Sequence, residues 1–153
     1  MELVLLGGFR ARVAGHVIDV PGRKERALLA FLAMPLGEVR SRDKLTGMLW
    51  SDRADKQARD SLKQAILRLR KSFGSEHSLP LLADRDTVTL DRDAVAVDVA
   101  EFEHLIGEGT PKSLAQATTL YRGDLLDGLD VRDAAFEEWL LQERQRLRVL
   151  VRE

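Results

Sequence analysis

Four side chains between positions 63 and 68 have types suited to recognising base pairs in duplex DNA. They are Lys63, Gln64, Leu67 and Arg68. Lysine and arginine donate hydrogen bonds to guanine, glutamine can pair with adenine, and an apolar side chain can contact the thymine methyl group. At about 100° per residue of helix, all four lie opposite an apolar stripe. The spacing predicts a base-reading helix face. The alternatives are a solvated basic face and, for Leu67, a lone exposed leucine.

Four further basic residues are predicted to contact DNA phosphates. Arg59, Arg70 and Lys71 belong to the same helix, and Arg85 lies at a hairpin turn. Contacts to phosphate fix the position of a protein on the duplex without reading its sequence. Arg85 has an aspartate on either side, so a solvated turn is the alternative for this residue.

The helix that carries these residues is predicted over residues 55–73, with Gly74 as its C-terminal stop. An apolar stripe must face the body of the protein, because burying a leucine or isoleucine side chain contributes roughly 1.5–3 kcal/mol. That stripe fixes the rotation of the helix about its axis and so selects the outward residues. Its members are Ala58, Leu62, Ala65, Ile66, Leu69 and Phe73.

The neighbouring elements follow the order of a winged helix-turn-helix. Three short antiparallel strands are predicted between residues 2 and 20, then helices over 23–34 and from the N-cap Ser41 to residue 50. A hairpin between residues 80 and 99 follows the basic helix, where it can lie along the neighbouring DNA backbone. The predicted fold class is therefore α+β, with an N-terminal antiparallel sheet, three helices and a C-terminal hairpin wing.

The charge and pattern change in the second half of the chain. Residues 1–75 carry a formal charge of +7 and residues 76–153 carry −8. A basic half can concentrate near phosphates, although two ordinary solvated surfaces are the alternative. Helices are predicted over 99–106, 111–126 and 134–152, the last without a stop signal before Glu153, which suggests that the protein continues. We predict a DNA-binding domain over 1–98 and the start of a truncated all-α domain over 99–153.

Several classes of function find no support in the composition. The chain has no cysteine, which excludes disulfides and thiolate chemistry, and its three histidines are scattered. No catalytic site, phosphate-binding glycine loop, cofactor or metal is predicted, and the hairpin aspartates lack the spacing of a calcium loop. No signal peptide or apolar run of membrane-spanning length is present. We therefore predict a soluble, cytoplasmic protein that is not an enzyme and has no membrane partner.

Two series of short blocks resemble a known family. LLGGF (5–9), GRKERALLA (22–30), LTGMLW (45–50) and LRK (69–71) resemble the DNA-binding domain of the Streptomyces antibiotic regulatory protein family. LADRDTV (82–88), VDVAEF (97–102), LYRGDLL (120–126) and FEEWL (136–140) resemble the bacterial transcriptional activator domain that follows it. The blocks occur in order and cover nearly the whole chain.

The resemblance implies a winged helix of the response-regulator type and a tetratricopeptide-like second domain. It also implies sequence-specific activators that bind repeated DNA sites, with a homodimer on DNA as one arrangement, and recruit RNA polymerase. By the same resemblance, the loop with Trp50, Asp52 and Arg53 is a candidate polymerase contact. The alternative for Trp50 is a side chain that fills the core. The alternative for the whole chain is a protein–protein interaction module of a larger signalling protein, with an incidental basic surface.

Overall fold

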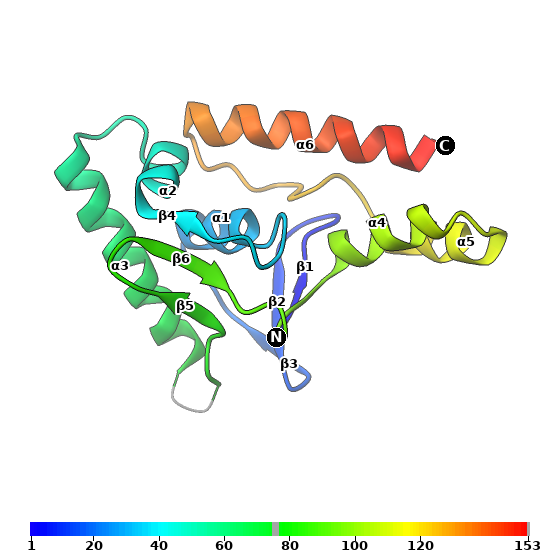
Figure 1. Cartoon of the computed structure of the whole chain (residues 1–153), viewed down its shortest axis with the longest axis horizontal. Helices are drawn as coiled ribbons and strands as arrows, with labels where there is room; N and C mark the ends of the chain where they lie inside the picture. Colours follow the sequence, from blue (N-terminus) through cyan, green and yellow to red (C-terminus); the bar gives the residue numbers. More distant parts are fainter. Residues whose placement is uncertain (75–76, 153) are drawn as a thin grey trace.

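The computed structural model describes residues 1–74 and 77–152, and its centre is a four-stranded sheet (Figure 1). The strands are β1 (Glu2–Val4), β2 (Arg10–Val13), β3 (His16–Ile18) and β7 (Ala96–Val97), in the order β3-β2-β1-β7. β1 pairs antiparallel with β2, and β2 with β3, as predicted. β7, predicted only as an extended exit from the hairpin, instead pairs in parallel with β1.

The winged helix consists of three helices and a second, smaller sheet. α1 (Arg23–Leu32), α2 (Arg42–Leu49) and α3 (Asp55–Phe73) occur where the apolar periodicity predicts them. The side chain of Ser41 accepts a hydrogen bond from the backbone N–H of Lys44 at 3.0 Å and caps α2. The wing, β5 (Leu81–Ala83) and β6 (Thr87–Leu90), is joined by the unpredicted two-residue strand β4 (Arg40–Ser41), in the order β4-β6-β5.

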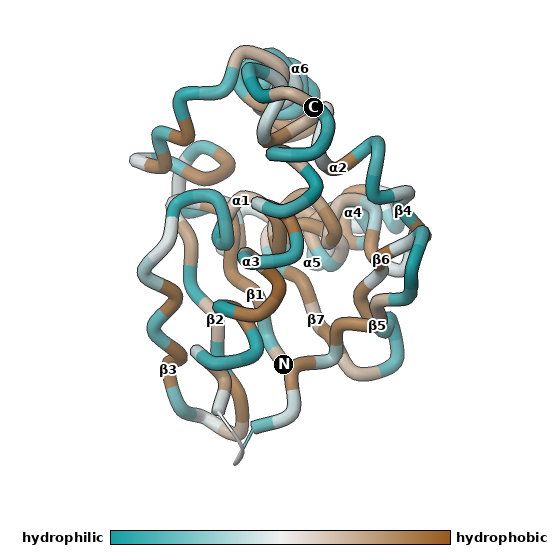
Figure 2. The backbone as a smooth tube through the Cα atoms, turned by 90° about the vertical axis from the view of Figure 1, so that its left-hand side faces the viewer, coloured by the Kyte–Doolittle hydropathy of each residue, from teal (hydrophilic) through white to brown (hydrophobic). Residues whose placement is uncertain are grey.

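The core is apolar and lies between the central sheet and the helices. Figure 2 shows hydrophobic segments, in brown, running through the middle of the molecule around β1 and β7. All six residues of the predicted stripe on α3 are buried. Gly74 follows α3 with a φ of 71°, a conformation that glycine adopts without strain. The rotation of α3 predicted from its stripe is therefore confirmed.

The second half consists of α4 (Asp98–Glu108), α5 (Pro111–Leu120) and α6 (Ala134–Arg152). The prediction of helix for residues 121–126 was wrong. Leu125 and Leu126 are both fully buried, and residue 125 forms a β-bridge with Leu6. Gly123 lies so close to Gly7 that a Cβ on it would be 3.2 Å from the Gly7 Cα. Pairing with the segment that follows β1 outweighs the local helical pattern there.

Contacts between the two halves make one continuous core. α6 lies across α1 and α2 in Figure 1, and the ring of Trp139 on α6 meets the ring of Phe31 on α1 at 5.1 Å, edge to face. The carboxylate of Asp98 accepts hydrogen bonds from the backbone N–H groups of Leu5 and Leu6, at 2.9 and 3.0 Å. Burial raises the pKa of Asp98, although these hydrogen bonds act to lower it.

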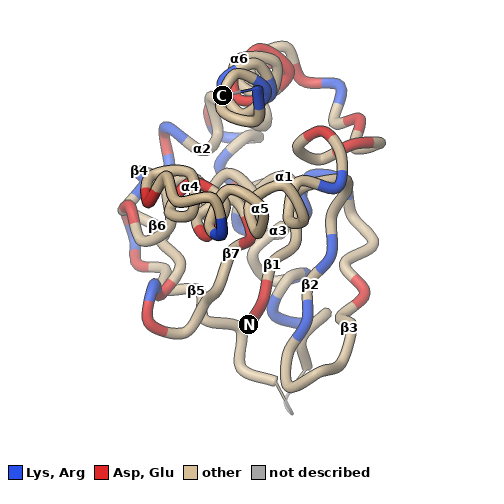
Figure 3. The backbone as a smooth tube through the Cα atoms, turned by 90° about the vertical axis from the view of Figure 1, so that its right-hand side faces the viewer, with Lys and Arg blue, Asp and Glu red and all other residues tan. Residues whose placement is uncertain are grey.

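The second half of the chain carries charges of both signs on its surface. Figure 3 shows both acidic and basic positions on α6. Arg146 on this helix pairs with Glu143 at 2.7 Å and with Glu103 on α4 at 2.8 Å. Within the described ranges, no helix combines the length and the apolar character needed to cross a membrane.

Candidate nucleic-acid interface

The face of α3 opposite its buried stripe is open to solvent. It holds the four predicted base-reading residues, Lys63, Gln64, Leu67 and Arg68, all of them exposed. Leu67 is 49 % exposed, so the structure allows either interpretation of this residue. The predicted phosphate contacts on the same helix, Arg59, Arg70 and Lys71, are exposed as well. One helix therefore presents a long polar and basic surface around a single leucine.

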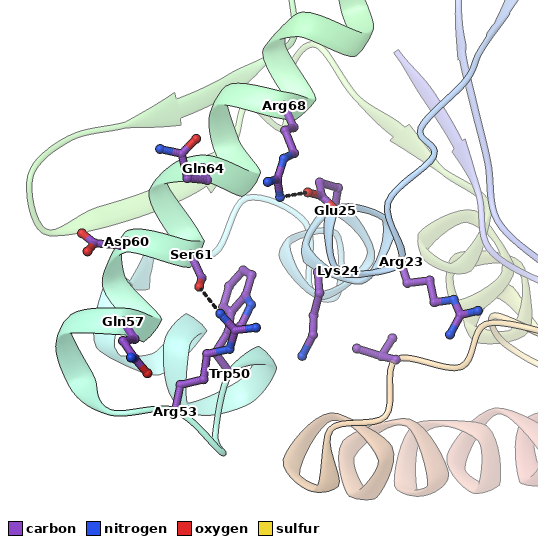
Figure 4. Close-up of a pocket in the computed structure, with 11 residues that line it drawn as sticks. Arg23, Lys24, Glu25, Trp50, Arg53, Gln57, Asp60, Ser61, Gln64 and Arg68 are labelled. Carbon is purple, nitrogen blue, oxygen red and sulfur yellow. Dashed lines mark hydrogen bonds and ion pairs between the residues drawn. The ribbon is translucent and has the colours of Figure 1, made fainter.

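A hollow of about 720 Å³ lies beside this face, between α3, α1 and the loop after α2. Figure 4 shows its lining, which brings together the predicted residues Trp50, Arg53, Gln64 and Arg68. Lys63 and Leu67 are not among the lining residues. The sequence did not identify the other lining residues as a site, because three separate segments supply them: Arg23, Lys24, Glu25, Gln57, Asp60, Ser61 and Val131.

Two arginines in the hollow are held by neighbouring side chains. Arg68 Nη1 lies 3.3 Å from Glu25 Oε1, and Arg53 Nη1 donates to Ser61 Oγ at 3.0 Å. In Figure 4 both arginines extend towards the hollow, and Gln64 and Asp60 contribute to its lining from α3. Arg68 on α3 and Arg53 in the loop just before this helix are thus each restrained by a neighbouring side chain.

Trp50 fills the core rather than the surface. Its side chain is only 4 % exposed, and the ammonium of Lys24 lies 5.6 Å from the centre of its ring. Lys24 also donates a hydrogen bond to the backbone carbonyl of Leu49. Asp52 and Arg53 are exposed, so a partner protein can reach them.

The loop after α2 is tied to the start of α6 by Asp133. This carboxylate accepts hydrogen bonds from the backbone N–H and the hydroxyl of Ser51, each at 2.9 Å. It also accepts from the backbone N–H groups of Ala135 and Phe136, at 2.9 and 3.3 Å, at the beginning of α6. Lys24 lies 3.9 Å away. One buried aspartate therefore joins the first half of the chain to the second.

The electrostatics of this aspartate have opposing causes. Burial acts to raise the pKa of Asp133, but the hydrogen bonds from Ser51 and Phe136, with the positive charge of Lys24, hold it below the ordinary value. Burial lowers the pKa of Lys24, and the negative charge of Asp133 opposes that change.

Arg85 lies exposed at the turn between β5 and β6. The aspartates around it order the turn. Asp84 Oδ1 accepts hydrogen bonds from the backbone N–H groups of Asp86 and Thr87 at 2.8 and 2.7 Å, and these lower the pKa of Asp84. The guanidinium of Arg42 donates two hydrogen bonds to the Asp84 carbonyl, at 2.9 and 2.7 Å. The turn is therefore ordered by its own side chains and by Arg42 from α2.

Over residues 1–74 and 77–152, no group of three or more histidine, cysteine, aspartate or glutamate side chains is placed to hold a metal ion. The rings of His16 and His77, far apart in the sequence, do lie 5.9 Å from each other. This contact places the β2–β3 hairpin beside the segment after α3.

Comparison with known proteins places this geometry in a family. Residues 20–96 match the family model described as "Transcriptional regulatory protein, C terminal". The chain is 28 % identical over 145 residues to the regulatory protein DnrI of Streptomyces peucetius, covering 82 % of this chain and 53 % of that protein. It therefore spans about half the length of that relative.

A solved structure has the same fold. It is described as Mycobacterium tuberculosis EmbR in complex with a low-affinity phosphopeptide. It matches with a TM-score of 0.69 and 22 % sequence identity, over 97 % of this chain and 43 % of that one. The chain belongs to the family that the matched family model describes, and its winged-helix domain occupies the matched residues 20–96. The predicted membership of the Streptomyces antibiotic regulatory protein family is confirmed.

Proposed function

We propose that this chain is the DNA-binding part of a sequence-specific transcription activator. The observation that carries the proposal is the outer face of α3, where polar and basic side chains stand opposite a fully buried stripe. The major groove of B-form DNA is about 12 Å wide and admits one α-helix. With α3 in the groove, Lys63, Gln64, Leu67 and Arg68 face the base edges.

Phosphate contacts surround this helix in the proposed complex. Arg59, Arg70 and Lys71 flank the base-reading face, and Arg85 at the tip of the wing reaches the neighbouring backbone. Such contacts supply affinity and orientation, whereas hydrogen bonds to base edges supply specificity. The net charge of +7 over residues 1–75 adds long-range attraction to the duplex.

The remaining parts of the proposal concern partners and organisation. Residues 1–98 form the DNA-binding domain, and residues 99–153 begin a helical, tetratricopeptide-like domain. Exposed Asp52 and Arg53, in the loop that Trp50 anchors, are the proposed contact with RNA polymerase in the cytoplasm. We further propose that a homodimer of the protein binds repeated DNA sites. The proposed function includes no catalytic step.

Replacing Arg70 with alanine is expected to weaken binding to all duplexes by a similar factor. Each phosphate contact contributes a slope of roughly −0.9 in log K against log salt concentration, so the slope should flatten by about one. Titrations of the whole chain at several salt concentrations measure both quantities. Arg152→Ala, at the exposed end of α6, is the matched control and should change neither. An unchanged slope in the Arg70 variant would argue against a phosphate contact.

Replacing Gln64 with alanine is expected to relax base preference at one or two base pairs. The lost contact corresponds to about 1–3 kcal/mol of discrimination against the wrong base. Selection of bound duplexes from a random pool, by wild type and variant, gives the two preferences side by side. Because Gln64 is exposed, its variant should have the same melting temperature as the wild type. Identical selected sequences would show that another element reads the groove.

A further inference from the structure

Glu25 is a nearly buried acid directly beneath the proposed base-reading face. Its side chain is 8 % exposed, whereas the side chain of its partner Arg68 is 69 % exposed. In the described part of the chain, Arg68 is the one basic group within 4.0 Å of the Glu25 carboxylate, at 3.3 Å. The pair joins the first turn of α1 to the middle of α3, and Figure 4 shows the guanidinium resting against the carboxylate.

The start of α1 leaves room for the Glu25 carboxylate. The carboxylate lies over the start of α1, where a Cβ on Gly22 would collide with it. Glycine at this N-cap position leaves the space that the carboxylate occupies. The unpaired N–H groups at the beginning of a helix also favour a negative charge there. A nearly buried carboxylate therefore lies beside the exposed guanidinium of Arg68.

We propose that Glu25 is a specificity-determining positioning residue that orients Arg68 towards a guanine edge. This inference rests on the proposed function. Arginine carries five N–H donors in a rigid plane, and recognition of guanine uses two of them at once. The contact with Glu25 leaves the other edge of the guanidinium free. A side chain that is already oriented loses less conformational freedom on binding, so the correct base pair gains more.

The same carboxylate disfavours a competing contact. An unrestrained arginine on this face can turn to a phosphate and bind any sequence. A negative charge beside it repels the phosphate, so the pair discriminates by opposing the wrong contact as well as by favouring the right one. Within residues 1–74 and 77–152, exposed Lys63 has no acidic partner within 4.0 Å, and we assign it no such restraint.

The test compares the wild-type chain with Glu25→Gln, Arg68→Ala and the double variant on three duplexes. These are the duplex selected by the wild type, versions with one base pair changed, and an unrelated duplex. Arg68→Ala should reduce discrimination at one base pair by about 5- to 150-fold. Glu25→Gln should reduce it at the same base pair by about 3- to 10-fold and should tighten binding to the unrelated duplex. In the double variant, Glu25→Gln should cause no further loss of discrimination.

Two more variants separate positioning from folding and from net charge. Glu25→Asp keeps the charge but shortens the reach, so it should lose discrimination without tightening binding to the unrelated duplex. Glu143→Gln makes the same charge change at a half-buried acid that is paired with Arg146 on α6. It should change neither the discrimination between base pairs nor the affinity for the unrelated duplex. Melting curves for every variant establish which of them are folded.

The possible results separate a failure of the role assigned to Glu25 from a failure of the proposed DNA-binding function. Equal weakening of binding to all duplexes by Glu25→Gln would give Glu25 a structural role only and overturn the inference. Unchanged discrimination by Arg68→Ala would also overturn it, while an altered preference in Gln64→Ala would leave the proposed function standing. Failure of the wild-type chain to bind any duplex would overturn the proposed function itself.

Discussion

Replacing Phe136 with alanine is expected to lower the free energy of unfolding of the whole chain by about 3–5 kcal/mol. Phe136 is fully buried at the start of α6, and its ring centre lies 5.3 Å from that of Trp139. Trp139 in turn packs against Phe31 on α1. Removing the ring leaves a cavity where the two halves meet, so both halves should lose stability together.

Denaturant unfolding followed by tryptophan fluorescence and circular dichroism measures this effect. The chain has two tryptophans, Trp50 in the first half and Trp139 in the second, so fluorescence reports on both. A single transition shifted to lower denaturant is the expected result. Leu141→Ala, on the same helix but 56 % exposed, should stay within about 0.5 kcal/mol of wild type. Two separate transitions, with the first half unaffected, would contradict a shared core.

Replacing Asp133 with alanine is expected to cost about 2–4 kcal/mol. The change removes the cap of α6 and leaves the part-buried donors of Ser51 without their acceptor. It also removes one of the two aspartate charges near Lys24. The loop after α2 should then become more mobile, which hydrogen exchange of the Ser51 amide would detect as faster exchange.

The stabilisation by Asp133 should depend on pH in a defined direction. Its pKa in the folded chain lies below the ordinary value of 3.8, so the ionised carboxylate stabilises the fold at higher pH. That contribution is lost as the pH falls below about 4 and through the folded pKa. The gap in stability between wild type and Asp133→Ala should therefore narrow in acid. Asp130→Ala, at an exposed position in the same segment, is the control and should show a small difference throughout. A gap that widens in acid would mean that the carboxylate is not the stabilising form.

Regular periodicity explains what the sequence predicts well. α3 spans Asp55–Phe73, the range predicted from its stripe, because nineteen residues of helix repeat the apolar pattern several times. The Ser41 cap and the turn around Arg85 depend on neighbouring residues and are equally visible in the sequence. Local rules suffice wherever the partners of a residue lie within one turn of helix or one hairpin.

Pairing between distant segments explains what the sequence does not predict. β4 has two residues and β7 has two, too few to show an alternating pattern, and each is defined by its partner strand. Residues 121–126 have a helical pattern, yet their backbone pairs with the segment that follows β1. The short strands and the break after α5 are thus decided by tertiary contacts.

The same distinction applies to the candidate interface. The outward residues of α3 follow from the rotation of one helix, so Lys63, Gln64 and Arg68 can be selected from the sequence. The contact of Arg68 with Glu25 and the contact of Ser51 with Asp133 join residues that lie 43 and 82 positions apart. An acid in the first turn of a helix is common, and nothing local distinguishes Glu25 from an ordinary surface residue.

The placement of β1 has a consequence for synthesis on the ribosome. One edge of β1 pairs with β2 nearby, but the other pairs with β7, and Leu6 pairs with Leu125. At about 5–20 residues per second, the first residues of the chain wait roughly 5–19 seconds for β7 and roughly 6–24 seconds for Leu125 to be made. During that interval the outer edge of β1 is an open template for strands of other nascent chains. Neighbouring ribosomes on one messenger RNA therefore bring together chains at the stage when this edge is unprotected.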